Sequence, residues 1–179
     1  MKEEIVIAGF GGQGVLSLGK ILAFAGLSDD KEVTWFPAYG PEQRGGTANV
    51  TVILSDEKIS SPVLDSYDIV IALNQQSIDK FLPKLKPGGI LIYDTNGIHR
   101  HPDRTDIQVY PVNAISGTLQ LGNPKVYNMV VMGALLKVMP YRIPQESIEM
   151  ALKRSLPERY HDSIPLNMEA IEIGKTLIQ

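Results

Sequence analysis

Four glycines near the start of the chain have a spacing that can bring the backbone close to a bound group. Gly9, Gly11 and Gly14 form the pattern G-x-G-x-x-G, with Gly12 and Gln13 inside it. The pattern follows a β-branched run and precedes an apolar, helix-like run, which is where dinucleotide-binding folds hold a pyrophosphate. A helix N-terminus also attracts anions through its free N–H groups and partial positive charge. These five residues are therefore candidates for contact with a cofactor.

The dinucleotide fingerprint is only half present. It also requires an acidic residue about 20 positions further on, at the end of the second strand, to bind the ribose hydroxyls. That position holds Trp35, Phe36 and Pro37, whereas Asp30 and Glu32 lie before the predicted strand or at its start. We therefore expect no binding of NAD, NADP or FAD. One alternative interpretation is a turn that is needed only for packing. The other is a turn that binds an anion or a partner's cofactor at the helix terminus.

A second glycine-rich segment, residues 39–49, mixes polar side chains with glycines, which is typical of loops that carry function. The candidate residues are Tyr39, Gly40, Glu42, Arg44, Gly45, Gly46 and Asn49. The guanidinium fork of Arg44 suits a carboxylate or a phosphate, and a solvent-exposed pair with Glu42 is the alternative. Because both glycine-rich segments follow strands of a predicted parallel sheet, we expect them to lie side by side at the carboxyl ends of the strands.

Two smaller polar segments also merit attention. His99 and His101 invite a metal interpretation, but Pro102 follows them and a solvated loop is favoured. Asp94 and Asn96 follow a strand that is predicted to be buried, at the edge where open α/β sheets bind ligands. Capping of a turn is the alternative role for the aspartate.

The apolar pattern predicts strands that alternate with helices. Strands are expected at residues 4–8, 31–36, 50–54, 68–73, 90–93 and 107–111, and helices at 14–26, 77–85, 125–139, 145–156 and 167–177. The first strand is apolar without alternation, which is typical of a strand buried on both faces. We therefore predict one α/β domain over residues 1–179, Rossmann-like, with a mostly parallel sheet and helices on both faces. Met129, Met132 and Met139 recur at helical spacing and are expected in the core.

Composition excludes several classes of protein. The 179 residues are 44% hydrophobic and 21% charged, which is ordinary for one globular domain. The formal net charge is −3 and no basic stripe is present, so we expect no nucleic-acid partner. The sequence has no cysteine, which excludes disulfides, cysteine-ligated iron–sulfur clusters and thiol catalysis in this chain. We see neither a secretory signal nor a membrane span, and expect a soluble cytoplasmic protein.

Three segments together resemble the gamma subunit of 2-oxoacid:ferredoxin oxidoreductases. They are GFGGQGVLSLGKIL, YGPEQRGGTANV and DIVIALNQQSIDKFLPKLKPGGILIYDTN. The same module occurs inside long pyruvate:ferredoxin oxidoreductases and in indolepyruvate enzymes. The resemblance covers nearly the whole chain and is strongest over residues 5–96. It implies a subunit without activity of its own, which packs on catalytic partner subunits near their thiamine site.

The resemblance also implies the chemistry of the complex. In that family thiamine diphosphate and Mg serve decarboxylation of a 2-oxoacid such as pyruvate or 2-oxoglutarate, [4Fe-4S] clusters pass electrons to ferredoxin, and coenzyme A accepts the acyl group. This chain also lacks the Gly-Asp-Gly segment that thiamine enzymes use. The resemblance therefore places these cofactors in alpha and beta partners, with delta as a further candidate, and implies that this chain alone binds none.

The resemblance also leads to expectations for the surface of this chain. The glycine turn and the loop at residues 39–49 would face the partners and coenzyme A. An exposed apolar patch is expected on the isolated chain, which could then form a homodimer. Two other classes fit parts of the sequence: a free-standing dinucleotide-binding oxidoreductase and a non-catalytic interaction module.

Overall fold

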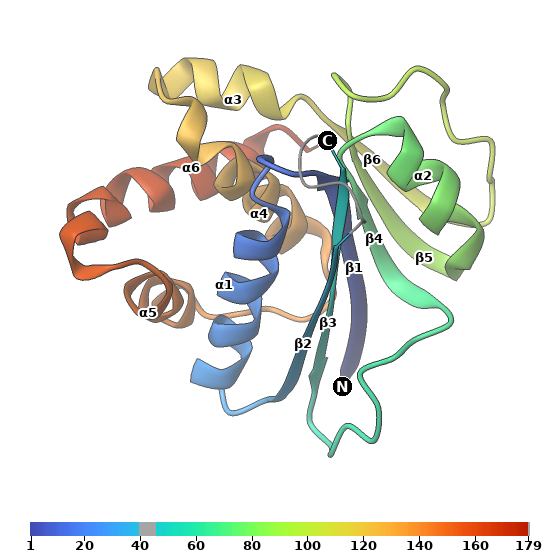
Figure 1. The fold of residues 1–179 in the computed structure, drawn as a ribbon, viewed down its shortest axis with the longest axis horizontal. Helices are drawn as coiled ribbons and strands as arrows, with labels where there is room; N and C mark the ends of the chain where they lie inside the picture. The colour runs from blue at the N-terminus through green and yellow to red at the C-terminus, as the bar shows by residue number, and fades with distance from the viewer. Residues whose placement is uncertain (40–45, 179) are drawn as a thin grey trace.

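The computed structural model describes residues 1–39 and 46–178, except for the side chain of Tyr39 (Figure 1). The strands are β1 (Lys2–Phe10), β2 (Glu32–Tyr39), β3 (Thr47–Ser55), β4 (Tyr67–Ala72), β5 (Leu85–Asp94) and β6 (Gln108–Val112). The α-helices are α1 (Val15–Ser28), α2 (Gln75–Phe81), α3 (Ala114–Leu121), α4 (Tyr127–Val138), α5 (Gln145–Ser155) and α6 (Ile164–Thr176). Short 3-10 helices are η1 (Leu82–Lys84), η2 (Pro124–Val126) and η3 (Glu158–Ser163).

The described strands form one sheet in the order β2-β3-β1-β4-β5-β6. The pairs β1–β4, β4–β5 and β5–β6 are parallel, whereas β3 runs antiparallel to both of its neighbours. The connection between β2 and β3, residues 40–46, is too short for the crossover of a dozen or more residues that a parallel pair requires. The predicted mostly parallel sheet is confirmed, with β3 as the exception among the described strands.

Helices cover both faces of the sheet, as predicted, but very unequally. Ile5 and Ile7 of β1 face a large core that includes residues of α1, α3, α4, α5 and α6. Val6 and Ala8 face a smaller core shared with α2. Figure 1 shows the sheet nearly edge-on, with α1, α4, α5 and α6 on one side and α2 on the other. The side chains of β1 are therefore buried on both faces, which explains its unbroken apolar run.

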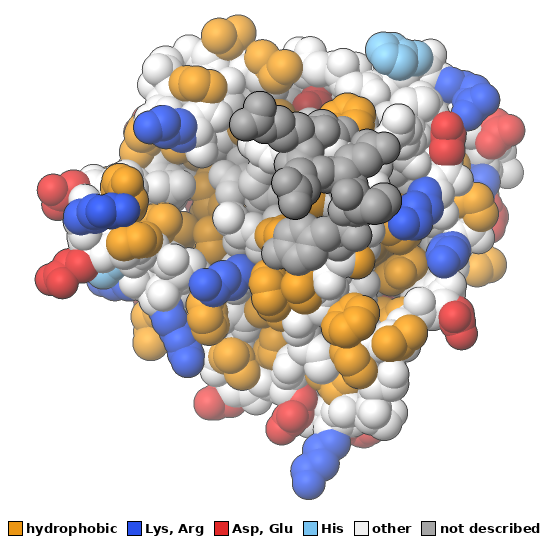
Figure 2. Space-filling model, in the orientation of Figure 1, with side chains coloured by type: hydrophobic (Ala, Val, Ile, Leu, Met, Phe, Trp, Pro, Cys, Tyr) orange, Lys and Arg blue, Asp and Glu red, His pale blue; other side chains and the backbone are white. Residues whose placement is uncertain are grey.

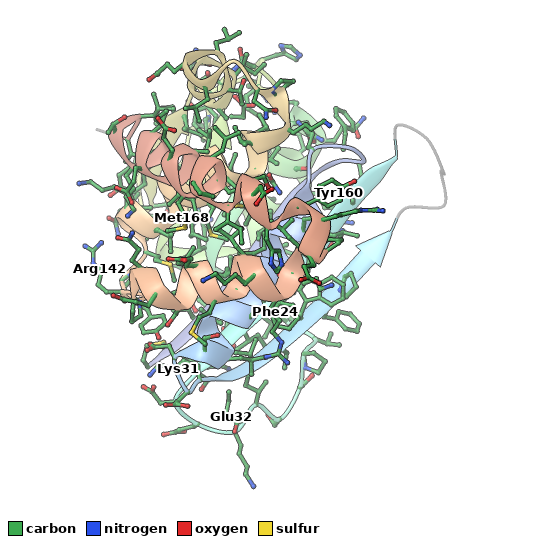
Figure 3. The ribbon with its side chains drawn as sticks, turned by 90° about the vertical axis from the view of Figure 1, so that its left-hand side faces the viewer. Phe24, Lys31, Glu32, Arg142, Tyr160 and Met168 are labelled. Atoms are coloured by element: carbon green, nitrogen blue, oxygen red, sulfur yellow. The ribbon has the colours of Figure 1, made fainter. Side chains whose placement is uncertain are left out.

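The helical layer is held together by close packing. Figure 3 shows α5 beside α1, with Phe24 of α1 labelled near their contact, where the Arg154 guanidinium lies 4.6 Å from the centre of the Phe24 ring. The backbones of α4 and α6 lie so close together that a methyl group added at Gly133 would overlap the carbonyl oxygen of Ile171. The predicted core methionines are buried: Met129, Met132 and Met139.

Several predicted boundaries were wrong. Strand β5 begins at Leu85 and not at residue 90, so residues 86–89 belong to the strand, and the preceding α-helix ends at Phe81 and not at residue 85. Lys86 is held in this strand by ion pairs to Glu4 and Asp68. Strands β2 and β3 extend into the segment predicted as a loop, and α3 was not predicted. No helix of the described residues is long and apolar enough to cross a membrane.

Candidate functional site

The glycine turn between β1 and α1 is held by its own glutamine. Gln13 Oε1 accepts a hydrogen bond from the Phe10 N–H at 2.6 Å, and Gln13 Nε2 donates to the Leu73 carbonyl oxygen at 3.3 Å. The Gln13 carboxamide therefore closes the turn through its oxygen and ties it through its nitrogen to the residue that follows β4. Helix α1 itself begins without a side-chain cap, after Gly14.

The glycines of the turn serve different purposes. A methyl group at Gly9 would lie 2.6 Å from Gln13 Oε1, and one at Gly14 would lie 2.8 Å from Asn128 Nδ2 of α4. Gly14 also has a left-handed φ of 73°, which disfavours other residues. Packing and conformation thus account for these two glycines. Gly12, with a φ of 92°, borders open space and lines a crevice described below.

The turn lies beside the described end of the second glycine-rich segment, as predicted. The Gly11 N–H donates to the Gly46 carbonyl oxygen at 3.1 Å. Asn49 belongs to β3 and not to a loop, paired with Ala8 of β1 and Ala38 of β2. The remaining predicted residues of this segment lie outside the described part of the chain: Gly40, Glu42, Arg44, Gly45 and the side chain of Tyr39.

A crevice of about 500 Å³ opens at the carboxyl ends of β1, β4 and β5. Parallel strands of an open α/β sheet usually carry their ligand sites at this edge. Phe10, Ile115, Leu119 and Pro124 contribute apolar surface to it. The glycine turn forms another side through Gly12 and Gln13. We take this crevice as the candidate functional site.

A buried carboxylate forms part of the crevice wall. Asp94 is only 2% exposed. Its Oδ1 accepts from the Asn96 N–H at 3.1 Å and from Asn96 Nδ2 at 2.9 Å, and its Oδ2 accepts from the Tyr127 hydroxyl at 2.5 Å. Burial, and next the Asp94 carboxylate, raise the pKa of Tyr127, so the phenol stays a hydrogen-bond donor. These contacts tie β5 to the start of α4 and fix the wall of the crevice.

Asn74, which lies between β4 and α2, has an unpaired donor among the described residues. Its Oδ1 accepts from the Ser77 N–H at 2.8 Å and thereby caps α2. This bond fixes the orientation of the amide. Asn74 Nδ2 is buried and has no hydrogen-bond partner among the described residues. Sequence reasoning missed Asn74, although Asn is one of the residues preferred at the N-cap of a helix.

Two other polar clusters have structural roles. His101 Nδ1 lies 3.2 Å from the Tyr93 hydroxyl, and no group of three or more His, Asp or Glu side chains in the described residues could hold a metal ion. At the opposite end of the strands, Asp56 pairs with Lys31 and with the N-terminal ammonium group. Lys31 first, and then the N-terminus, lower the pKa of Asp56 to about 2.

The sequence matches the pyruvate ferredoxin/flavodoxin oxidoreductase family over residues 4–177. The chain belongs to this family. It is 36% identical over 171 residues to the ketoisovalerate oxidoreductase subunit VorA of Methanothermobacter thermautotrophicus, covering 96% of this chain and 35% of that protein. It is also 36% identical over 163 residues to the 2-oxoglutarate synthase subunit KorC of Methanocaldococcus jannaschii, covering 88% of this chain and 86% of that subunit.

Two solved structures of oxidoreductases share the fold. The gamma subunit of a keto/oxoacid ferredoxin oxidoreductase from Geobacter sulfurreducens superposes with a TM-score of 0.83 and 28% identity, over 100% of this chain and 99% of that one. The 2-oxoglutarate:ferredoxin oxidoreductase of Magnetococcus marinus, solved with 2-oxoglutarate, coenzyme A and succinyl-CoA bound, gives a TM-score of 0.87 and 28% identity. That match covers 98% of this chain and 31% of the other, so this chain spans about a third of its longer relatives.

The resemblance read from the three sequence segments is thus confirmed. The strand order of this chain separates the end of β2 from the glycine turn, because β3 lies between β2 and β1. In a dinucleotide-binding fold the acidic residue that binds the ribose would stand at the end of that second strand. Here β2 carries Trp35, Phe36 and Pro37. Absence of NAD, NADP and FAD binding stays a prediction.

The exposed large apolar side chains include two neighbouring pairs. Trp35 and Phe36 lie on the edge strand β2, and Ile115 and Leu119 lie on α3. Figure 2 shows hydrophobic side chains gathered both in the region of α3 and in the region of the β2 edge. Such surface is typical of faces that contact partners. A partner interface and a homodimer of the isolated chain stay predictions.

Proposed function

We propose that this chain is the gamma subunit of a thiamine diphosphate-dependent 2-oxoacid:ferredoxin oxidoreductase that forms acyl-CoA. The observation that carries the proposal is the similarity to the Geobacter gamma subunit over the whole length of both chains. The proposed complex oxidises a 2-oxoacid in the cytoplasm and passes its electrons to ferredoxin. Ketoisovalerate and 2-oxoglutarate are the first substrates to test, because relatives are named for them.

The donor set of the chain supports a division of labour with partner subunits. An iron–sulfur cluster of the [4Fe-4S] type requires cysteine ligands, and the sequence has none. We propose that the alpha and beta subunits, with delta as a further candidate, hold the clusters, thiamine diphosphate and Mg. The isolated chain is then expected to be inactive.

The edge that carries the glycine turn is the face we assign to the partners and to coenzyme A. Support comes from the crevice at the carboxyl ends of the strands and from the contact between Gly11 and Gly46. The Magnetococcus relative binds coenzyme A, which makes a coenzyme A role for this edge chemically reasonable. Within the loop, Arg44 is the side chain best suited to a carboxylate or a phosphate.

Reconstitution tests the proposal. The partner subunits are purified with and without this chain, and reduction of a viologen dye is measured with pyruvate, 2-oxoglutarate or ketoisovalerate in the presence of coenzyme A. We expect turnover only when this chain and its partners are combined. Full coenzyme A-dependent turnover by the partners without this chain, or any turnover by this chain alone, would contradict the proposal.

A further inference from the structure

We infer that a pocket at the far end of α4 binds a small carboxylate with an aliphatic body. The pocket measures about 210 Å³ and is lined by residues of α4, α5, α6 and the connection between α4 and α5. It is separate from the crevice, because α4 begins beside the crevice at Tyr127 and reaches this pocket at Lys137, about 15 Å further along the helix axis. The inference goes beyond the proposed function and does not depend on it.

An excess of positive charge is the first argument. The lining contains three cations and one carboxylate, although the whole chain has a formal net charge of −3. The one carboxylate, Glu172, already pairs with Lys175 at 2.6 Å. Among the described residues, no carboxylate lies within ion-pair distance of the other two cations, Lys137 and Arg142. An anion that enters the pocket therefore meets positive charge that the protein does not compensate.

The position of Arg142 leaves part of its guanidinium group available to an anion. Arg142 Nη1 donates to the carbonyl oxygens of Leu136 at 3.4 Å and of Lys137 at 3.2 Å, at the end of α4. These bonds offset the partial negative charge that the last carbonyl groups of a helix carry. The Nε and Nη2 groups make no hydrogen bond with a described residue, and together they match the two oxygens of a carboxylate.

The apolar floor of the pocket favours an aliphatic body on that anion. Ile148 of α5 and Ile171 of α6 are 2% and 1% exposed, and both line the pocket. Met168 of α6 is half-buried and also lines it. Figure 3 shows Met168 between α5 and α6, with Arg142 at the left of the same face. An inorganic anion would leave this floor uncovered, whereas methyl and methylene groups gain by removing it from water.

The volume of the pocket limits the ligand to a small molecule. The 210 Å³ correspond to about seven water molecules at roughly 30 Å³ each. A branched carboxylic acid such as isovalerate has a similar number of non-hydrogen atoms and therefore fits the space. Nucleotides and coenzyme A are far larger, so this pocket is not a second site for them.

Titration of the purified full chain with three related compounds tests the inference. Isovalerate is the probe, isovaleramide keeps its aliphatic body without the charge, and acetate keeps the charge without the body. NMR of isotope-labelled isoleucine methyl groups follows Ile148 and Ile171 at the floor of the pocket. We expect isovalerate to bind with a dissociation constant of about 1 mM or below, and the other two compounds to bind at least about tenfold more weakly.

A pair of matched variants locates the binding. Lys137→Gln and Lys84→Gln each remove one positive charge from an exposed lysine, but only Lys137 lines the pocket. Lys137→Gln should weaken isovalerate binding about threefold, and Lys84→Gln should leave it unchanged. Equal effects of the two variants, or binding of isovaleramide or acetate as tight as that of isovalerate, would overturn the inference. Absence of a saturable shift at Ile148 and Ile171 would overturn it as well.

Discussion

Replacing Tyr127 by phenylalanine should destabilise the fold through a single hydrogen bond. The Tyr127 hydroxyl donates to Asp94 Oδ2 at 2.5 Å, and no other described residue donates to that oxygen. The variant leaves a buried carboxylate oxygen without this partner, while the ring and its packing remain. A hydrogen bond to a charged group contributes about 1.5–3 kcal/mol, so we expect a loss of that size in the free energy of unfolding. For a domain of this size this corresponds to a fall of about 3–12 °C in Tm.

Urea unfolding at pH 7, followed by circular dichroism, measures this loss. Tyr110→Phe is the matched control, because the Tyr110 hydroxyl donates to Gln108 Oε1 in an exposed position and its removal should change stability by less than about 0.5 kcal/mol. Heteronuclear NMR of both variants would check that the fold is kept. If Tyr127→Phe is no more destabilising than Tyr110→Phe, the Asp94–Tyr127 contact does not hold α4 to β5.

Three further predictions concern packing, pH and the partner-facing loop. Gly133→Ala should destabilise the fold by about 1–3 kcal/mol in thermal unfolding, because the added methyl overlaps the Ile171 carbonyl oxygen; increased stability would refute the close helix contact. The pKa of Asp56 is lowered to about 2, so its pairs stabilise the fold above the ordinary carboxyl value of 3.8 and this contribution is lost as the pH falls toward 2. Asp56→Asn should therefore lower the urea midpoint at pH 7 but not at pH 2, and a deficit that persists at pH 2 would contradict this. Arg44→Ala should abolish assembly of the reconstituted complex, or raise KM for coenzyme A or the 2-oxoacid about tenfold, about 1.4 kcal/mol; unchanged assembly and kinetics would refute its role.

The periodicity of the sequence predicted most elements because their large apolar side chains face the core. Helix α3 breaks that rule. Its buried residues are Ala114, Gly117 and Thr118, whereas Ile115 and Leu119 are exposed at the crevice. Ile115 and Leu119 are spaced like one face of a helix, but α3 has only 8 residues. This is shorter than the window of about 11–18 residues over which apolar spacing identifies a helix, so α3 was not recognised from the sequence.

Apolar periodicity predicts neither the direction of β3 nor which residues line the crevice. The β-branched run at residues 50–54 indicates a strand, but only the short connection after β2 indicates that it runs antiparallel. The crevice combines segments that are distant in sequence, such as Gln13, Asn74 and Leu119. Sequence reasoning identified the glycine turn and the segment at Asp94 and Asn96 as candidates, yet their meeting with α3 depends on the sheet order.

The position of β3 has a consequence for synthesis of the protein on the ribosome. Strand β1 is made first, but both of its neighbours in the sheet are made much later: Lys2 pairs with Ser55, and Ile5 pairs with Ile69. Until β3 has emerged, the apolar strand β1 has two unpaired edges, and one of them stays unpaired until β4 has emerged. An unpaired apolar strand of this kind aggregates during slow, non-local folding. The hairpin of β2 and β3 is local and can form earlier, since Tyr39 pairs with Ala48. Nascent chains that are released before β4 should therefore depend on chaperones far more than the finished subunit does.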